Sequence, residues 1–213
     1  MPIAATASRR FLALGDSYTI GEGVACDERW PHQLARRLRA DGIAVGDAEI
    51  VATTGWTTGE LAAAMDAQHF TPPYALVSLL IGVNNQYRGR PLDNYREEFV
   101  DLVARAVALA GARREHVIVV SIPDWGVTRF ARSKGCDAAR IAGEIDAFNA
   151  AARTIACDSG IAFVDITADS RAAGDADDLL GADGLHPSAV QYARWTTLIE
   201  PFARVALAAE SSG

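Results

Sequence analysis

Short, strongly apolar segments alternate with longer amphipathic segments along almost the whole chain, and this alternation constrains the fold more than any other feature. Five β-rich runs recur, over residues 11–14, 49–53, 75–81, 116–122 and 161–166. The runs that begin at Ala75 and His116 are nearly continuous in apolar residues, as strands that are covered on both faces should be. Strands of this kind occur in parallel sheets that have helices on both sides. We therefore predict an α/β fold with a parallel sheet.

The segments between these runs have the hydrophobic periodicity of helices. The clearest helix is predicted over residues 92–110, and Gly111 follows it as a typical C-terminal signal. Further helices are predicted over residues 30–40, 58–67, 137–159 and 188–209. Pro201 should kink or split the last of them. The longest irregular segments are then 123–135 and 170–184, near the carboxyl edge of the sheet, where long loops are often functional.

Length and charge limit the kinds of protein that this sequence can encode. Its 213 residues fit one domain over residues 1–213. Acidic residues outnumber basic ones by 27 to 20, for a net charge of −7, which argues against a nucleic-acid partner. The N-terminal segment lacks the apolar run of a signal peptide, and no later stretch reaches about 18 consecutive apolar residues. We expect a cytoplasmic protein without a membrane span; the sequence carries no signal for an oligomeric state.

The three cysteines do not form a recognisable framework. Cys26, Cys136 and Cys157 are widely spaced and make no CxxC pair. This spacing suggests neither a disulfide scaffold nor a zinc site, so free thiols and no metal are expected. A pairing between Cys26 and Cys136, which both lie in predicted loops, stays open.

The first predicted strand ends in a segment that could carry a nucleophile, Gly15-Asp16-Ser17-Tyr18. Gly15 permits a tight turn, after which the Ser17 hydroxyl would project into solvent. A serine hydroxyl is a weak nucleophile unless a neighbouring base takes its proton. The alternative is that Ser17 caps a helix or closes a turn.

Two further strand ends carry groups that could stabilise a developing oxyanion. Gly55 follows the second strand and would allow a backbone N–H to come close to a reacting oxygen. Asn84 follows the third strand, and its amide can donate a hydrogen bond without carrying a titratable charge. Turn geometry would explain both residues equally well, with Thr57 or Thr58 capping the helix after Gly55.

Asp183 and His186 lie three residues apart just before the last predicted helix. This separation lets the carboxylate reach Nδ1 of the imidazole, which leaves Nε2 free to accept a proton. The alternative is a surface aspartate that caps the helix and a solvated histidine. Since parallel strands end at one edge of a sheet, Ser17, His186 and Asp183 could meet there as nucleophile, base and orienting acid, the set that acyl transfer requires.

Together these four segments resemble the SGNH, or GDSL-type, hydrolases, which are named for a serine, a glycine, an asparagine and a histidine. The matching residues are Ser17 in Gly-Asp-Ser-Tyr, Gly55, Asn84 in Gly-Val-Asn-Asn, and His186 in Asp-Gly-Leu-His-Pro. The resemblance covers essentially the whole chain. It implies a three-layer α/β/α sandwich with a five-stranded parallel sheet in flavodoxin-like order, and hydrolysis of an ester without a cofactor.

The resemblance also implies a role for each matching residue. Ser17 would attack an acyl carbonyl, His186 would take the serine proton, and Asp183 would orient His186. The backbone N–H groups of Ser17 and Gly55 and the amide of Asn84 would form the oxyanion hole. The expected partner is a small ester with a short acyl chain. An acetylated sugar as substrate, or transfer of the acyl group to another acceptor, would use the same site.

A non-catalytic alternative is a flavodoxin-like domain that binds a phosphate through the backbone of residues 15–23. That segment lacks the GxxxxGK[ST] pattern, and this alternative leaves Asp183 and His186 unexplained.

The chain departs from the usual family pattern at Tyr18, where leucine is common, and at Asn85, where aspartate is common. Both departures bear on the choice of substrate more than on the chemistry. The expected walls of the substrate pocket are Tyr18, Trp56, Asn85, Tyr87 and Trp125. The alternative for Trp56, Tyr87 and Trp125 is that they are loop residues that pack on the domain.

Arg88 and Arg90 follow the asparagine pair on the next stretch of chain. They could meet an anionic substrate, but we expect them to be a solvated part of a loop.

Overall fold

A five-stranded sheet forms the centre of the computed structural model, which describes residues 9–208. Its strands are β1 (Arg9–Gly15), β2 (Val45–Ala52), β3 (Leu76–Leu80), β4 (Val117–Val120) and β5 (Ala162–Val164). They lie in the order β2-β1-β3-β4-β5, and every neighbouring pair is parallel. The predicted parallel sheet in flavodoxin-like order is confirmed.

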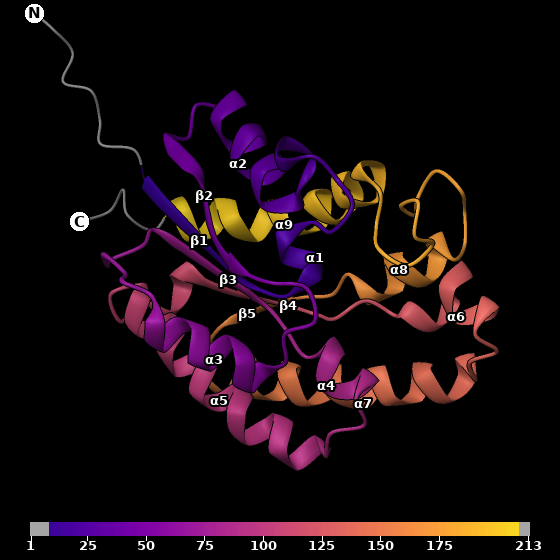
Figure 1. The fold of residues 1–213 in the computed structure, drawn as a ribbon. Coiled ribbons are helices and arrows are strands. Elements are labelled where there is room, and N and C mark those ends of the chain that lie inside the picture. Colours follow the sequence, from indigo (N-terminus) through magenta and orange to yellow (C-terminus); the bar gives the residue numbers. More distant parts are fainter. Residues whose placement is uncertain (1–8, 209–213) are drawn as a thin grey trace, which may run out of the picture.

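Long helices cover both faces of this sheet (Figure 1). On one face α2 (Trp30–Ala40) packs against α9 (Ala189–Ala208). On the other face lie α3 (Thr58–Ala67), α5 (Leu92–Leu109) and α7 (Ala138–Asp158), with α5 packed between its two neighbours. These layers confirm the predicted α/β/α sandwich and place each long helix within two residues of its predicted bounds, apart from Ala209, which lies outside the described residues.

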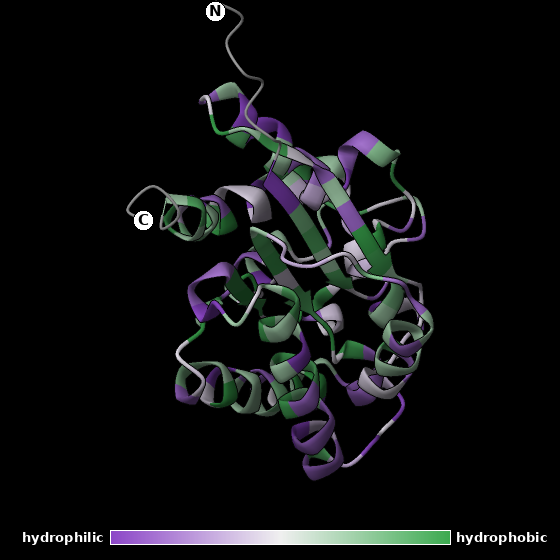
Figure 2. Ribbon diagram, turned by 90° about the vertical axis from the view of Figure 1, so that its left-hand side faces the viewer, coloured by the Kyte–Doolittle hydropathy of each residue, from purple (hydrophilic) through white to green (hydrophobic). Residues whose placement is uncertain are grey.

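Burial explains why the central strands are apolar throughout. Every residue of β3 and β4 is buried, whereas β2 at the edge of the sheet contains buried, half-buried and exposed residues. Figure 2 shows the strands largely in hydrophobic colours and the helices polar on the side that faces solvent. The buried side chains of the sheet and of its two helical layers form one hydrophobic core. Each fully buried Leu or Val side chain contributes roughly 1.5–3 kcal/mol of transfer free energy to it.

The segments between the long elements contain more helix than the sequence predicted. Four short helices follow strands or loops: α1 (Ser17–Ile20), α4 (Val83–Tyr87), α6 (Arg129–Ser133) and α8 (Thr167–Ala173). Three 3-10 turns, η1 (Cys26–Glu28), η2 (Arg114–His116) and η3 (Trp125–Val127), complete the described elements. The prediction that residues 123–135 and 170–184 are irregular is therefore wrong over η3, α6 and the end of α8. Such short helices show no hydrophobic period, because they are stabilised by capping side chains and local packing.

The last helix differs from its prediction at Pro201. Helix α9 continues from Ala189 through Pro201 to Ala208 and is not split. Proline removes one N–H donor, but Ile199 and Ala203 on either side are fully buried against the core. Tertiary packing thus maintains the helix where local preference would break it.

The cysteines are not linked to one another in the structure. Cys26 and Cys157 are exposed and Cys136 is half-buried. Within residues 9–208 no helix combines the length and the apolar character needed to cross a bilayer.

Close packing at the end of β1 gives a first prediction. A Cβ added to Gly15 would lie 2.5 Å from the backbone oxygen of Leu80 and 2.2 Å from Oγ1 of Thr19. The backbone oxygen cannot move without disturbing β3, so Gly15→Ala should lower the free energy of unfolding by about 1–3 kcal/mol. Urea denaturation measures this change.

Gly143 provides the matched control, because a Cβ there would meet nothing within 4 Å and the residue lies inside α7. Gly143→Ala should raise stability by up to about 1 kcal/mol, as alanine is the better helix former. If Gly15→Ala is as harmless as Gly143→Ala, close packing is not what requires glycine at residue 15.

Candidate active site

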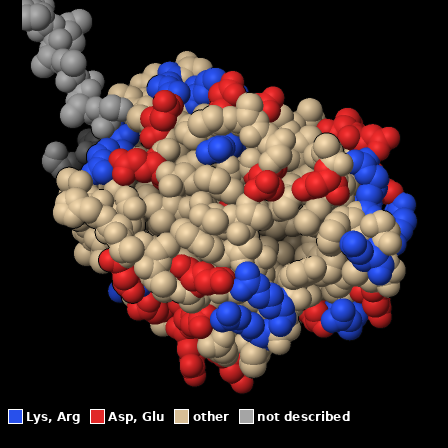
Figure 3. Space-filling model, in the orientation of Figure 1, with Lys and Arg blue, Asp and Glu red and all other residues tan. Residues whose placement is uncertain are grey.

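A cavity of about 190 Å³ opens at the carboxyl ends of the strands. Figure 3 shows this face of the molecule, where a hollow with a mostly uncharged floor is visible. The lining residues come from every part of the chain and are Ser17, Tyr18, Thr54, Gly55, Val83, Asn84, Tyr87, Trp125, Phe130, Leu185 and His186. The fold thus brings the predicted serine, glycine, asparagine and histidine to one cavity.

Ser17 is the first residue of α1, directly after the end of β1. The helix is capped by Asp16 and not by Ser17, because Asp16 Oδ1 accepts a hydrogen bond of 3.0 Å from the N–H of Tyr18. The backbone N–H of Ser17 itself has no hydrogen-bond acceptor among residues 9–208. Its side chain is only 4% exposed, yet it reaches the cavity.

Asp183 and His186 form the pair that their spacing predicts. Asp183 Oδ2 lies 2.6 Å from Nδ1 of His186, and Oδ1 accepts the backbone N–H groups of Leu185 and His186 at 2.9 and 3.0 Å. Burial alone would raise the pKa of Asp183, but the hydrogen bonds from His186 and the backbone outweigh it, so the pKa is lowered. An ionised Asp183 holds the imidazole with Nε2 as the remaining ring nitrogen.

The imidazole is also packed from behind. The ring of Tyr18 lies 5.5 Å from that of His186, with a tilt of 54° between them, and Tyr18 in turn packs on Trp195 at 6.0 Å. Tyr18 is 3% exposed and lines the cavity. It therefore forms the wall beside the histidine.

The described residues contain no hydrogen bond between Ser17 Oγ and His186 Nε2, although both side chains line the same cavity. Catalytic hydrogen bonds are often long in the absence of substrate and shorten only in the reacting complex. The arrangement is compatible with proton transfer between these two groups once a substrate orders them.

Gly55 and Asn84 line the same cavity, and each has an N–H without a hydrogen-bond partner among the described residues. Gly55 has a φ of +88°, which favours glycine, and its N–H has no acceptor among the described residues. Asn84 Nδ2 donates one hydrogen to the carbonyl oxygen of Trp56 at 2.9 Å. Because an amide nitrogen carries two hydrogens, the second remains for a ligand in the cavity.

Three side chains of one segment hold the backbone around Gly55. From Asn84 to Arg88, α4 and its C-cap contact successive residues of the facing loop: Asn84 bonds Trp56, Asn85 bonds Thr58, and Arg88 Nη2 donates to the carbonyl oxygen of Gly55 at 2.5 Å. The other guanidinium nitrogen of Arg88 pairs with Glu60 at 3.1 Å. The expectation that Arg88 is a solvated loop residue is thus wrong; it clamps the backbone beside the cavity.

Glu60 completes this clamp from the start of α3. Its carboxylate accepts the N–H and the hydroxyl of Thr57, both at 2.8 Å, and Thr57 caps the helix as one of the alternatives had it. These hydrogen bonds, with the Arg88 guanidinium, lower the pKa of Glu60.

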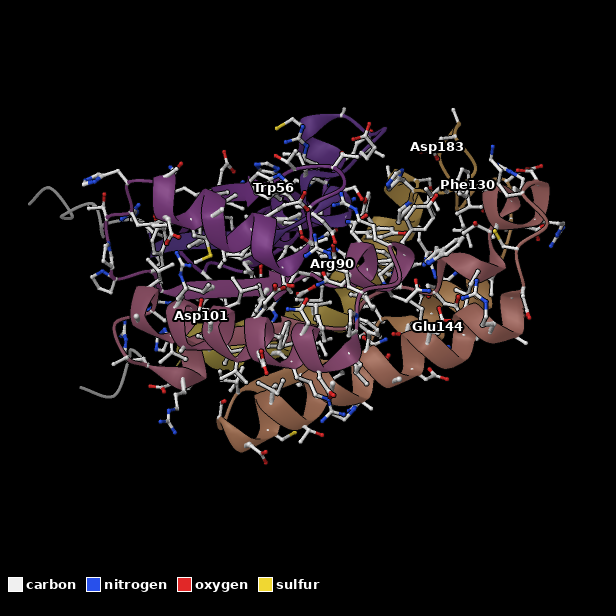
Figure 4. All side chains as sticks on the ribbon, turned by 60° about the horizontal axis from the view of Figure 1, so that its bottom comes forward. Trp56, Arg90, Asp101, Phe130, Glu144 and Asp183 are labelled. Carbon is white, nitrogen blue, oxygen red and sulfur yellow. The ribbon has the colours of Figure 1, made fainter. Side chains whose placement is uncertain are left out.

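Asn85 and Trp56, which were expected to line the pocket, lie outside the cavity. Asn85 is fully buried; its Oδ1 accepts the N–H of Thr58 at 3.0 Å and its Nδ2 donates to Thr58 Oγ1 at 2.6 Å. Thr58 Oγ1 donates in turn to Glu98. Trp56 packs its ring on the core, and Figure 4 shows it well apart from Phe130 and Asp183.

Tyr87 and Trp125 line the cavity as predicted from their positions after strand ends. Their rings meet edge-on, 5.2 Å apart, although Tyr87 is 58% exposed. The lining residues that the sequence did not single out are Thr54, Val83, Phe130 and Leu185. Val83 and Leu185 belong to the Gly-Val-Asn-Asn and Asp-Gly-Leu-His-Pro segments. Their positions directly before Asn84 and His186 could have predicted that they line the cavity. Phe130 gave no such signal, because α6 was not predicted.

Within residues 9–208 no three or more His, Cys, Asp or Glu side chains gather as a metal site would require.

Comparison with known proteins agrees with this geometry. The model of the GDSL-like lipase/acylhydrolase family matches residues 13–194, a range that contains Ser17, Gly55, Asn84 and His186. No curated protein sequence matches the chain.

Many solved structures share the fold. TesA has a TM-score of 0.74 at 20% identity, covering 93% of this chain and 100% of its own. The psychrotrophic esterase EstA from Pseudoalteromonas sp., in a structure inhibited by monoethylphosphonate, has a TM-score of 0.67 at 18% identity, covering 97% and 100%. A lipase/acylhydrolase from Enterococcus faecalis has a TM-score of 0.66 at 20% identity, covering 91% and 94%.

Asp16 gives a prediction for the pH dependence of stability. Burial raises its pKa from 3.8 to about 7, despite the N–H bond from Tyr18, and Oδ2 has no hydrogen-bond partner. As pH rises, Asp16 therefore loses its proton at a lower pH in the unfolded chain than in the folded protein. The free energy of unfolding consequently falls between about pH 4 and about pH 7. Asp16→Asn keeps the capping oxygen and should remove that loss of stability.

Chemical denaturation of the two proteins between about pH 4 and pH 8 measures the effect. The stability of Asp16→Asn relative to wild type should increase with pH and level off above about pH 7. A constant difference, or one that grows on acidification, contradicts a protonated Asp16 in the folded protein.

Proposed function

Because the chain belongs to the GDSL-like lipase/acylhydrolase family, we propose that it hydrolyses small esters with short acyl chains through an acyl-enzyme on Ser17. The observation that supports this most strongly is the 2.6 Å hydrogen bond between Asp183 and His186 at the cavity that Ser17 also lines. A base with a fixed tautomer beside a buried serine is what nucleophilic catalysis needs.

In the first half of the proposed reaction, Ser17 Oγ forms a bond to the carbonyl carbon of the ester, and its proton passes to Nε2 of His186. Asp183 stabilises the imidazolium that results, since its carboxylate is ionised and bonded to Nδ1. The tetrahedral intermediate then collapses, and His186 returns the proton to the departing alcohol. The acyl group is left on Ser17.

Three donors are available for the oxygen that becomes negative in this step. They are the N–H of Ser17, the N–H of Gly55 and the second amide hydrogen of Asn84, and all three residues line the cavity. Each donor is already in position before the reaction and stabilises the negative charge that develops in the transition state. Loss of one such donor typically lowers kcat by about 10² to 10³. Arg88 supports this role indirectly because it holds the backbone of Gly55.

In the second half, water attacks the acyl-enzyme with His186 as base. The carboxylic acid leaves, and the proton returns to Ser17. The same groups serve both halves, so no further residue is required.

The size of the cavity supports short acyl chains. Its volume of about 190 Å³ is below the roughly 300–1,000 Å³ of pockets that enclose drug-sized ligands. The walls next to the donors are apolar or aromatic, from Val83, Tyr87, Trp125 and Phe130. A short hydrocarbon chain fits such walls better than a polar group does.

The proposal predicts that Ser17→Ala lowers kcat on p-nitrophenyl acetate and butyrate by at least about 10³-fold, because nucleophile and base act as a unit. Steady-state kinetics measure the loss, and the urea midpoint checks that the fold is kept. Ser159→Ala is the control: this half-buried serine ends α7 at the opposite edge of the sheet, and its loss should leave kcat unchanged. Ester hydrolysis that survives Ser17→Ala would assign the nucleophile to another residue.

A further inference from the structure

A second hollow of about 510 Å³ adjoins the first cavity, between α4 and α7. Its walls include Gln86, Tyr87, Arg90, Trp125, Arg140 and Glu144, and we call it the basic groove. Nothing in the proposed reaction uses Arg90, Arg140 or Glu144. The groove therefore needs its own explanation.

The basic groove is continuous with the cavity at the Tyr87–Trp125 ring pair. Both residues line both hollows, and their rings meet edge-on at a centroid distance of 5.2 Å. A molecule bound at Ser17 that extends beyond these two rings would enter the groove.

The groove carries a positive charge that the protein does not neutralise. Arg140 pairs with Glu144 at 2.6 Å, and the second carboxylate oxygen of Glu144 accepts the amide of Gln86 at 2.6 Å. Arg90 is half-buried, and among the described residues its guanidinium has neither an ion pair nor a hydrogen bond. Two guanidinium groups against one carboxylate leave an excess of one positive charge, in a chain whose net charge is −7.

Several other half-buried arginines of this protein are paired with carboxylates. Arg105 pairs with Asp66 at 2.6 Å and Arg171 pairs with Asp124 at 2.8 Å. Arg90 has lost part of its water without gaining a carboxylate, and guanidinium groups bind carboxylates through a rigid pair of donors. Figure 3 shows Lys and Arg side chains over α4 and over α6 on this hollowed face, and Figure 4 labels Arg90 and Glu144.

Hydrogen bonds connect the groove to the cavity wall. Trp125 Nε1 donates to Gln86 Oε1 at 2.7 Å, Gln86 donates to Glu144, and Glu144 holds Arg140. Gln86 is 5% exposed, so the bond between Trp125 and Gln86 is shielded from water, whereas Arg140 at the other end is exposed. Glu144 is thereby occupied on both oxygens and is not free to neutralise Arg90.

The position of His186 indicates which part of an ester reaches the groove. The departing alcohol must lie beside His186, which protonates it, and the carbonyl oxygen must lie toward Gly55 and Asn84. The acyl chain takes the remaining direction. His186 and Leu185 line the first cavity and not the groove, whereas Tyr87 and Trp125 line both.

We propose that the basic groove binds a carboxylate at the far end of the acyl chain, so that the preferred substrates are monoesters of dicarboxylic acids. Arg90 makes the main contact, since Arg140 is already paired with Glu144. This inference rests on the proposed function and specifies the substrate class for the same Ser17 site. It also changes the expectation for Arg90, which was a solvated loop residue.

The test compares esters that differ only in the terminal carboxylate. Mono-p-nitrophenyl adipate is matched with p-nitrophenyl hexanoate, and the suberate monoester with the octanoate. We measure kcat/KM for wild type, Arg90→Gln and Arg114→Gln. Arg114 is an exposed arginine in η2 on the opposite edge of the sheet, so its replacement removes the same charge without touching the groove.

Arg90→Gln should reduce kcat/KM about tenfold for one or both dicarboxylic monoesters, the value of one charge-assisted hydrogen bond, and change the matched neutral esters by less than about twofold. Arg114→Gln should change neither. Arg90→Lys keeps the charge but loses the paired donors, so it should lie between wild type and Arg90→Gln. Circular dichroism and the urea midpoint verify that each variant folds.

Equal losses on neutral and anionic esters would show that Arg90 has a structural role and would overturn the proposal. So would an unchanged preference in Arg90→Gln, or an equal effect of Arg114→Gln. If wild type hydrolyses the neutral esters but Arg90→Gln changes kcat/KM by the same factor on anionic and neutral esters, only the groove assignment is wrong. If wild type hydrolyses p-nitrophenyl acetate and butyrate but none of the four longer esters, only the groove assignment is wrong; if it hydrolyses none of the six, the proposed function itself fails.

Discussion

Burial of the central strands on both faces is the constraint on which the rest of the structure depends. A parallel sheet with helices on each side requires a long return after every strand, so all its carboxyl ends lie at one edge. That edge receives Ser17 from β1, the Gly55 segment from β2 and Asn84 from β3, while His186 arrives just before α9. Residues that are distant in the sequence share one cavity because the core leaves the chain no other compact route.

The second level of organisation is polar and local. The side chains of Asn84, Asn85 and Arg88 bond the facing loop at Trp56, Thr58 and Gly55, which sets the direction of the Gly55 N–H. Asn85 donates to Thr58, whose hydroxyl donates to Glu98. An aspartate at residue 85 could not donate to Thr58 and would bring a second carboxylate near Glu98. The departure from the usual family pattern at this residue is therefore explained by its buried hydrogen bonds, and not by substrate contact.

Sequence reasoning located the elements that have a period or a motif. The apolar runs of β3 and β4 and the long helices α3, α5 and α7 were predicted because burial imposes a repeat on their residues. The spacing of Asp183 and His186 predicted their contact. Helices α1, α4 and α6 were missed because four or five residues carry no period, and Phe130 was missed with α6. The roles of Arg88 and Asn85 depend on partners about thirty residues away, which no local pattern encodes.

In the proposed reaction the Ser17 hydroxyl, with His186 as its base, attacks the acyl carbon. The direct measurement is to treat the wild-type protein and a His186→Ala variant with a p-nitrophenyl ethylphosphonate and to locate the adduct by peptide mass spectrometry. The attacking oxygen displaces p-nitrophenolate from phosphorus and keeps the phosphonyl group as a stable covalent adduct. We expect one adduct, on Ser17, formed far more slowly in His186→Ala. An adduct on another residue, or equal labelling rates in the two proteins, would contradict it.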